Sequence, residues 1–212
     1  MRQIFWSIVI GISALPLTLL GQPDALPLLR IVLDPQHPSE SRGELLSVTG
    51  QPSFTFSVGF GRNGVSPAGA RFRPGYSLLG AFRINAILSV DRFEMEESLV
   101  VGSSKTRSWL ADHLFANMNS IDFDGDGQSG EYGAAFIGLE PLPPTVAQPF
   151  GFQTYRGVFR WYSYALHGNR DDARVGECRS GGCVNTTKAA LEHILPSLRL
   201  GDRVEILEAQ RR

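Results

Sequence analysis

The sequence predicts a mainly β protein, arranged as a β-sandwich or a partly open β-fold, with a short helix near its C-terminus. Three observations support this fold class. Several short segments alternate apolar and polar residues, turns rich in glycine and proline separate them, and only two segments have helical spacing. Numerous short strands with few helices are typical of packed sheets rather than of alternating β and α units.

The strands of the first half are predicted from apolar alternation. In residues 53–60, Phe54, Phe56, Val58 and Phe60 alternate with small or polar residues. Residues 82–90 repeat this pattern, and the glycine- and proline-rich stretch 61–80 is predicted to be a long loop between the two strands. Further extended segments are predicted at 28–33, 43–49 and 93–102.

The second half contains the two predicted helices. The first covers residues 109–118, and the second carries Ala190, Leu191 and Ile194 on one face before Pro196 ends it. Asn185 or Thr186 is predicted to cap the second helix. Extended segments are predicted at 133–139 and 204–206, and residues 159–166 are predicted to form one strand that leads to His167.

Composition predicts one globular domain. The chain has 212 residues, enough for one full core, and 42% of them are hydrophobic. Its 20 Lys and Arg residues against 21 Asp and Glu residues give a net charge of −1. A net charge this small produces no strong electrostatic attraction to nucleic acid or to an anionic membrane, and we expect neither as a partner.

Residues 1–22 have the pattern of an export signal. Arg2 precedes an apolar run from Ile4 to Leu20, which Pro16 interrupts. A secretory signal is favoured over a short membrane span, with cleavage expected between Gly21 and Ala25. We therefore expect a mature domain at residues 26–212, located in the periplasm or cell wall, with no membrane contact beyond the signal.

The candidate catalytic residues are His167 and Cys183. A thiol needs a base to become a nucleophile, and a histidine suits that task near neutral pH. A helix is expected directly after Cys183, and its N-terminus would favour the thiolate. The N–H groups of Gly182 and Cys183 would face an oxyanion. The Gly168 carbonyl would accept a hydrogen bond from the imidazole of His167 and so fix its tautomer. The alternative interpretation is a structural cysteine beside an unrelated histidine.

A family resemblance joins these residues. His167-Gly168, a loop, and then Ser180, Gly182, Cys183 and Asn185 resemble the signature of the YkuD-type L,D-transpeptidases, in which His-Gly and a loop precede Ser or Thr and then His-Gly-Cys-x-Asn. Gly181 stands where the family usually has its second histidine. Looser similarity at residues 56–60, 79–84 and 200–206 extends the resemblance over most of residues 28–207.

The resemblance implies an exported cysteine acyltransferase that acts on peptidoglycan stem peptides and requires no cofactor. Cys183 would attack the carbonyl of an L,D bond and form a thioester, with His167 as the base and with support from Gly168, Ser180, Gly182 and Asn185. The acceptor would be an amine of a second stem or of a wall protein. A hydrolytic variant, of L,D-carboxypeptidase or amidase type, would use water instead.

Two further features leave alternatives open. Cys178 lies five positions before Cys183, so in an oxidising compartment the two could form a disulfide that blocks the nucleophile. Asp122, Asp124 and Asp126 match the start of a calcium loop, but Gly133 stands where the bidentate glutamate belongs. A non-catalytic wall-binding module, stabilised by calcium, is therefore the alternative to an enzyme.

Overall fold

A computed structural model describes residue 26 and residues 28–123, 125–143 and 148–210. The predicted export signal at residues 1–22 lies outside the described residues. Within them, no helix is both long and apolar enough to span a membrane.

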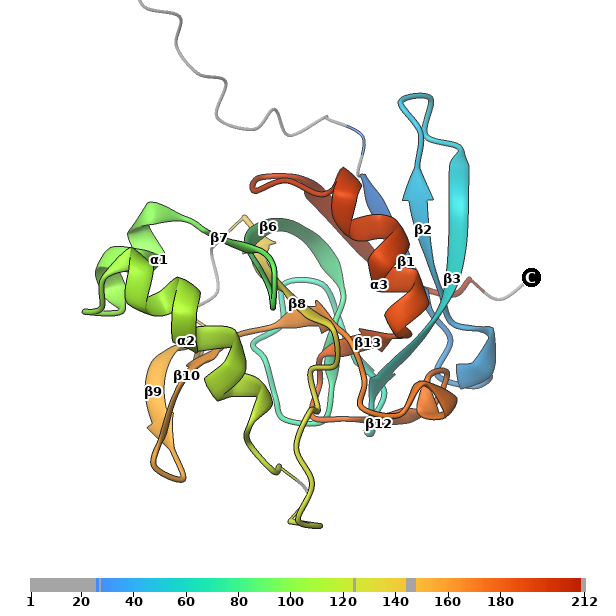
Figure 1. Cartoon of the computed structure of the whole chain (residues 1–212). Helices are drawn as coiled ribbons and strands as arrows, with labels where there is room; N and C mark the ends of the chain where they lie inside the picture. Colours follow the sequence, from blue (N-terminus) through green and yellow to red (C-terminus); the bar gives the residue numbers. More distant parts are fainter. Residues whose placement is uncertain (1–25, 27, 124, 144–147, 211–212) are drawn as a thin grey trace, which may run out of the picture.

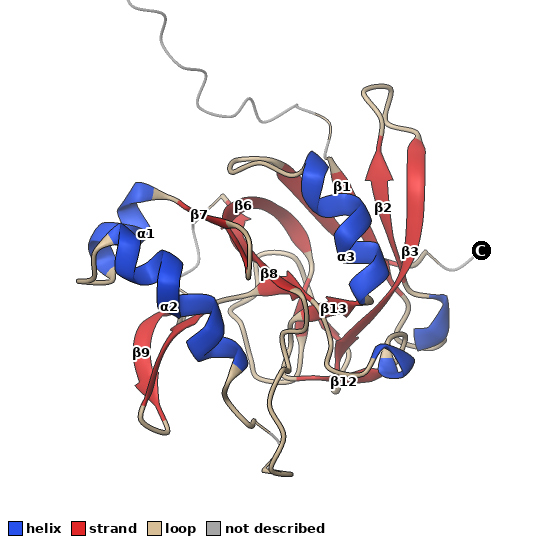
Figure 2. Cartoon of the chain, in the orientation of Figure 1, coloured by secondary structure: helices blue, strands red, loops and turns tan. Residues whose placement is uncertain are grey.

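One ten-stranded sheet dominates the structure (Figures 1 and 2). Its strands are β1 (Leu29–Leu33), β2 (Arg42–Leu46), β3 (Pro52–Gly61), β6 (Gly80–Ser89), β7 (Phe93–Met95), β8 (Ala135–Leu142), β11 (Ala165–His167), β12 (Cys178–Ser180), β13 (Val184–Thr186) and β14 (Arg203–Glu208). The mainly β prediction is therefore confirmed. Two small sheets join β4 (Val65–Ser66) to β5 (Ser77–Leu78) and β9 (Gly151–Tyr155) to β10 (Val158–Tyr162).

The large sheet closes on itself. Its strands follow the order β3-β13-β11-β8-β6-β14-β1-β2, and β2 pairs again with β3. Most neighbours are antiparallel, whereas β1 and β14, β11 and β13, and β3 and β12 are parallel. Closure leaves these eight strands with neighbours on both sides, which removes the exposed edges that an open sheet would present.

The main core lies within this closed sheet. Alternate residues of β3 and β6 point into it, including the fully buried Val58, Phe60 and Ile84. The short helix α3 (Lys188–Ile194) adds Leu191 and Ile194 to the same core. Burial of apolar surface at about 25 cal/mol per Å² makes this cluster the principal source of stability.

A second core lies between the sheet and two helices, α1 (Glu97–Gly102) and α2 (Arg107–Asn119). Thr106 caps α2 by accepting a hydrogen bond from the Trp109 N–H at 3.2 Å. Leu110 and Leu114 then pack in the same cluster as Trp161 of β10. Figure 2 shows α2 lying beside the β9–β10 hairpin.

Two predicted strands were wrong in extent. Residues 93–102 form β7 only as far as Met95 and then the helix α1, which buries Val100 and leaves Val101 72% exposed. The predicted strand 159–166 is two strands, β10 and β11, in different sheets. They separate at Ser163 and Tyr164, where the Tyr164 hydroxyl turns into the main core and donates to the Leu78 carbonyl at 3.1 Å.

The predicted cap of α3 was also wrong. Asn185 and Thr186 belong to β13, where they pair with Gly59 and Val58 of β3. Thr187 therefore caps the helix, and its hydroxyl accepts from the Ala190 N–H at 3.2 Å. Three short 3-10 turns complete the fold: η1 (Pro38–Glu40), η2 (Asp172–Arg174) and η3 (Leu195–Ser197).

Candidate active site

A cavity of about 760 Å³ brings the predicted catalytic residues together. His167, Ser180, Cys183 and Asn185 all line it. The parallel pairing of β11 with β13 places His167 opposite Asn185 and Leu166 opposite Val184, so Cys183 precedes the paired segment by one residue. The sixteen-residue separation in sequence is thus closed by two adjacent strands of the main sheet.

His167 is positioned as a proton acceptor. Its side chain is buried, with Tyr132 edge-on at 5.0 Å between ring centroids and Phe136 stacked at 6.2 Å. Its Nδ1 lies 2.5 Å from the Gly168 carbonyl oxygen, so Nδ1–H donates there and Nε2 is left to accept a proton. Burial lowers the pKa of His167 to about 4, although the Gly168 hydrogen bond opposes this shift, and the imidazole is therefore neutral at pH 7.

Gly168 holds its carbonyl in place through backbone packing. A Cβ at this position would lie 2.8 Å from both the Ala134 N and the Tyr132 O. The Gly168 N–H donates to the Ala135 carbonyl at 3.0 Å, which ties the residue to β8. Only glycine therefore permits this close approach of two backbones, and with it the hydrogen bond that orients the imidazole.

Cys183 lies where the two hydrophobic cores meet, and it packs against both. Its Sγ is 3.7 Å from the Ser163 carbonyl oxygen. Burial raises the pKa of the Cys183 thiol to about 12, although a hydrogen bond from the Ala165 backbone favours the thiolate. The free protein thus holds a neutral thiol and a neutral imidazole in the same cavity, rather than a thiolate and an imidazolium.

Three tyrosines surround the sulfur. Burial raises the pKa of Tyr132, Tyr162 and Tyr164, and a negative charge on Cys183 raises each of them further. The phenols therefore remain protonated at neutral pH and contribute no competing negative charge to the cavity. The sequence did not single them out, because their proximity to Cys183 depends on tertiary packing.

The turn before Cys183 is fixed by hydrogen bonds. The Ser180 hydroxyl donates to the Cys183 carbonyl at 2.5 Å and accepts from the Gly182 N–H at 3.1 Å, while Ser77 Oγ donates to the Gly182 carbonyl at 2.6 Å. Gly182 has φ +131°, and a Cβ there would lie 2.7 Å from the Phe72 ring. The Gly182 N–H is therefore already bonded, which leaves the Cys183 N–H as the predicted oxyanion donor.

The predicted helix N-terminus at Cys183 was wrong. Strand β13 and the cap Thr187 separate Cys183 from α3, which begins at Lys188. The α3 dipole consequently lies beyond the first turn over which it stabilises an anion. This separation agrees with the raised pKa of the Cys183 thiol, since burial is not offset by a helix terminus.

Gly181 occupies an open position. It is exposed, lines the cavity, and no atom lies within 4 Å of a Cβ built on it. A larger side chain therefore fits here, in contrast to Gly182.

Cys178 and Cys183 are both free cysteines, so the disulfide alternative is not observed. Cys178 belongs to β12 and pairs with Phe60 of β3. Burial raises the pKa of the Cys178 thiol.

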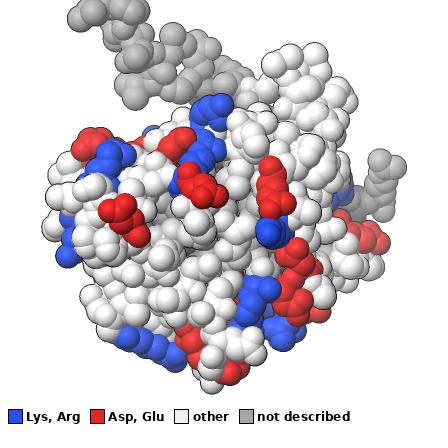
Figure 3. Space-filling model, viewed as in Figure 1, with Lys and Arg blue, Asp and Glu red and all other residues white. Residues whose placement is uncertain are grey.

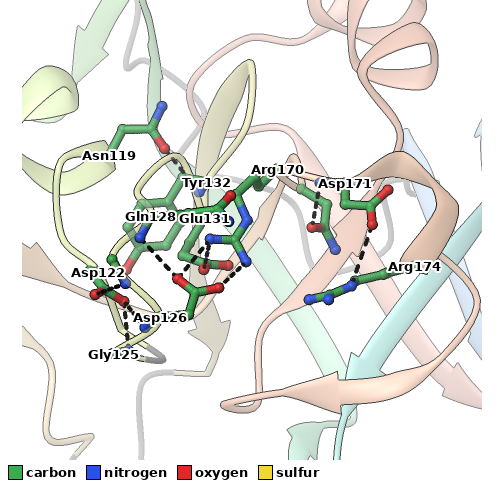
Figure 4. A network of polar contacts seen from close by, with 12 residues as sticks. Asn119, Asp122, Gly125, Asp126, Gln128, Glu131, Tyr132, Arg170, Asp171 and Arg174 are labelled. Atoms are coloured by element: carbon green, nitrogen blue, oxygen red, sulfur yellow. Dashed lines mark hydrogen bonds and ion pairs between the residues drawn. The ribbon is translucent and has the colours of Figure 1, made fainter.

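The acidic loop at residues 122–131 packs against the loop that follows His167 (Figure 4). The Asp122 carboxylate accepts from the N–H groups of Gly125 and Gly127 at 2.6 and 2.9 Å. The Asp126 carboxylate accepts from the two terminal guanidinium nitrogens of Arg170, at 2.8 and 3.2 Å. Asp124 lies outside the described residues, so the calcium prediction stays a prediction, although two of its three carboxylates already have donors.

Charges of both signs are interspersed over the face that Figure 3 shows. Among the described residues, salt bridges join charges of opposite sign, such as Arg30 to Glu44 at 3.5 Å and Arg170 to Asp126 at 2.8 Å.

Comparison with known proteins gives one family. The YkuD family model, described as an L,D-transpeptidase catalytic domain, matches residues 41–206. A comparison with curated proteins gives no match.

Solved structures give distant similarities. An L,D-transpeptidase from Xylanimonas cellulosilytica is 14% identical, with 87% of this chain and 62% of that chain covered and a TM-score of 0.40. L,D-transpeptidase 3 from Mycobacterium tuberculosis, in complex with a faropenem-derived adduct, is 15% identical, with coverage of 86% and 61% and a TM-score of 0.43. The chain thus spans about three-fifths of the length of these two structures.

Proposed function

Because the chain belongs to the YkuD family of L,D-transpeptidase catalytic domains, we propose that it is an exported cysteine acyltransferase acting on peptidoglycan stem peptides. The observation that carries the proposal is the cavity that Cys183 and His167 line together, with Nε2 of His167 available to accept a proton. Ser180 and Gly182 hold the turn of the nucleophile, Gly168 orients the base, and Asn185 lies beside it.

The proposed reaction begins from the neutral pair. As Cys183 Sγ attacks the peptide carbonyl, its proton passes to His167 Nε2, and the carbonyl oxygen becomes an oxyanion facing the Cys183 N–H. The C–N bond then breaks, and the imidazolium gives its proton to the departing amine. Because the thiol pKa is about 12 and the imidazole pKa about 4, proton transfer accompanies attack instead of preceding it.

The thioester is resolved by a second nucleophile. An acceptor amine attacks the thioester carbonyl, His167 takes the amine's proton, and the sulfur leaves as a thiolate that is reprotonated. A second cavity of about 430 Å³ supports this step, because Ser163, whose carbonyl contacts Cys183 Sγ, lines both cavities. The acceptor would enter through one cavity while the acyl chain occupies the other. Water in place of the amine gives hydrolysis.

Incubation of purified peptidoglycan with the protein, followed by analysis of the released stem peptides, tests the proposal. We expect new cross-links and a free terminal D-amino acid from the native protein, and neither from Cys183→Ala. Cys178→Ala is the matched control, because Cys178 is not among the described residues that line the cavity, and it should behave as the native protein. Trimmed stems without cross-links would assign the hydrolytic outcome, and unchanged stems with native protein would contradict the proposal.

A further inference from the structure

Arg160 lies in the active-site cavity within a cage of aromatic rings. It belongs to β10, where Phe159 and Trp161 pack toward α2 and the second core. Because side chains alternate along a strand, Arg160 and Tyr162 are on the other face, and both line the cavity. The Arg160 Cζ lies 4.3, 5.1 and 5.6 Å from the ring centroids of Tyr155, Tyr162 and Phe123.

The same rings connect Arg160 to the catalytic base. Phe123 stacks on Tyr155 at 5.7 Å and meets Tyr132 edge-on at 5.6 Å, and Tyr132 in turn meets His167 edge-on at 5.0 Å. These aromatic residues all line the cavity. They form a continuous wall with the imidazole at one end and the guanidinium at the other, along which a peptide chain can lie.

Among the described residues, the guanidinium of Arg160 meets aromatic rings but has no hydrogen-bond acceptor and no counterion. Its Nε is buried without a hydrogen bond, and no ion pair joins it to a described carboxylate. Of the other arginines that line the cavity, Arg174 pairs with Asp171 at 3.4 Å and Arg179 with Glu177 at 3.1 Å. Arg62 has no counterion among the described residues either, but it is exposed, so water solvates its charge. A partly buried cation without a counterion is costly, and an anionic ligand would remove that cost.

The positive charge does not serve the nucleophile. Burial and the Ala165 backbone set the pKa of the Cys183 thiol, whereas Arg160 lowers the pKa of Tyr132 and Tyr162 against the larger opposing effect of burial. Arg160 is therefore close to the tyrosines that adjoin the sulfur but is not a thiolate partner. Its position suits a group of the substrate several bonds away from the reacting carbonyl.

We propose that Arg160 binds a carboxylate of the acyl-donor peptide and so determines which peptides are accepted. This inference rests on the proposed function and adds a specificity residue to it. The planar guanidinium presents paired N–H groups that match the two oxygens of a carboxylate, and the surrounding rings hold its plane. The carboxylate belongs either to the C-terminus of the donor or to a side chain within it, and both would be recognised by the same chemistry.

The test combines changes in the protein with changes in the peptide. A donor peptide with both carboxylates free is compared with two versions, one amidated at the C-terminus and one amidated at the side chain. For native protein, amidation of the carboxylate that Arg160 binds should lower kcat/KM about 10- to 100-fold, mainly through KM. Arg160→Met should cause a similar loss with the free peptide and almost no additional loss with that amidated version.

Two variants separate recognition from folding. Arg160→Lys keeps the charge without the fork and should recover only part of the affinity. Arg156→Met is the matched control, since Arg156 lies beside the same Tyr155 ring at 5.5 Å but donates to the Asp122 carbonyl and does not appear among the described residues lining the cavity. It should retain native discrimination between the free and amidated peptides.

Binding without turnover distinguishes failure of this inference from failure of the proposed function. The same peptides are titrated calorimetrically into Cys183→Ala and into Cys183→Ala with Arg160→Met. Carboxylate-dependent binding that Arg160→Met abolishes supports the site even if the native protein shows no acyl transfer. Equal loss with free and amidated peptides, or unchanged binding in Arg160→Met, overturns the site even if transfer is normal.

Discussion

At the scale of single residues, the proposed site contains groups whose charges are suppressed by burial. His167 is neutral because its pKa falls to about 4, and Cys183 is neutral because its pKa rises to about 12. The sequence identified both residues, because a glycine-flanked cysteine and a His-Gly pair form a recognisable pattern. The sequence did not indicate Arg160 or Tyr132, since their positions in the cavity depend on contacts made between distant segments.

The lowered pKa of His167 predicts the acid limb of activity. The imidazole must be neutral to accept the thiol proton, so kcat/KM should fall as the pH drops toward about 4 rather than through 6.5, the ordinary pKa of histidine. A pH profile of kcat/KM with a donor peptide measures this. An acid limb centred near 6.5 would show that burial does not lower the pKa of His167 as described.

The raised pKa of Cys183 predicts slow alkylation of the free protein. In Cys178→Ala, which leaves one thiol, the iodoacetamide rate should be low at pH 7 and should still be rising at pH 10, because the thiolate fraction increases toward a pKa of about 12. Mass spectrometry of the labelled peptide measures it. A rate that reaches its plateau below pH 8 would indicate a preformed thiolate and would contradict the neutral pair.

At the scale of elements, the sequence predicted those whose pattern is local. Strands expected at 53–60 and 82–90 appear as β3 and β6, and the helix expected at 109–118 lies within α2. It failed where pairing with distant strands overrides local pattern, as for Asn185 and Thr186 in β13. The sequence pattern also predicted β10 and β11 as one strand, because the apolar alternation continues past the point where the chain passes from one sheet to the other.

The contact between Gly168 and β8 predicts a strong effect of a single methyl group. Gly168→Ala should destabilise the protein by about 2 kcal/mol, because its Cβ would lie 2.8 Å from backbone atoms, and should lower activity further by displacing the carbonyl that orients His167. Gly181→Ala is the control and should leave the melting temperature nearly unchanged, since its Cβ meets no atom within 4 Å. Thermal denaturation measures the melting temperatures of the two variants. Equal melting temperatures would contradict the close backbone packing described at Gly168.

At the scale of the whole molecule, a closed sheet and a helical layer meet at Cys183. The main core fills the closed sheet, the second core holds α1, α2 and the β9–β10 hairpin, and the sulfur packs against both. The alternating pattern and the family resemblance predicted a mainly β domain. They did not predict that the sheet closes through the pairing of β2 with β3, because that closure depends on strand pairings between distant parts of the chain. Because Cys183 packs against both cores, its position depends on the stability of the closed sheet and of the helical layer.

Burial of His167 predicts how global stability depends on pH. Its pKa is about 4 when folded and 6.5 in the unfolded reference, so between these values the unfolded chain binds more protons. The free energy of unfolding should therefore rise from pH 4 to 6.5, by about 3 kcal/mol for this group. Urea denaturation of native protein and His167→Gln gives the difference, in which the other titrating groups cancel. A difference that is constant across this range would contradict the buried neutral imidazole.

The central claim is that Cys183 carries the acyl group, and mass spectrometry of the trapped intermediate tests it most directly. After brief incubation with a donor peptide and acid quenching, the native protein should gain the mass of the donor minus the free terminal amino acid that is released, located on the peptide that contains Cys183. Cys178→Ala should show the same adduct and Cys183→Ala none. An adduct on Cys178, or product formation by Cys183→Ala, would contradict the claim.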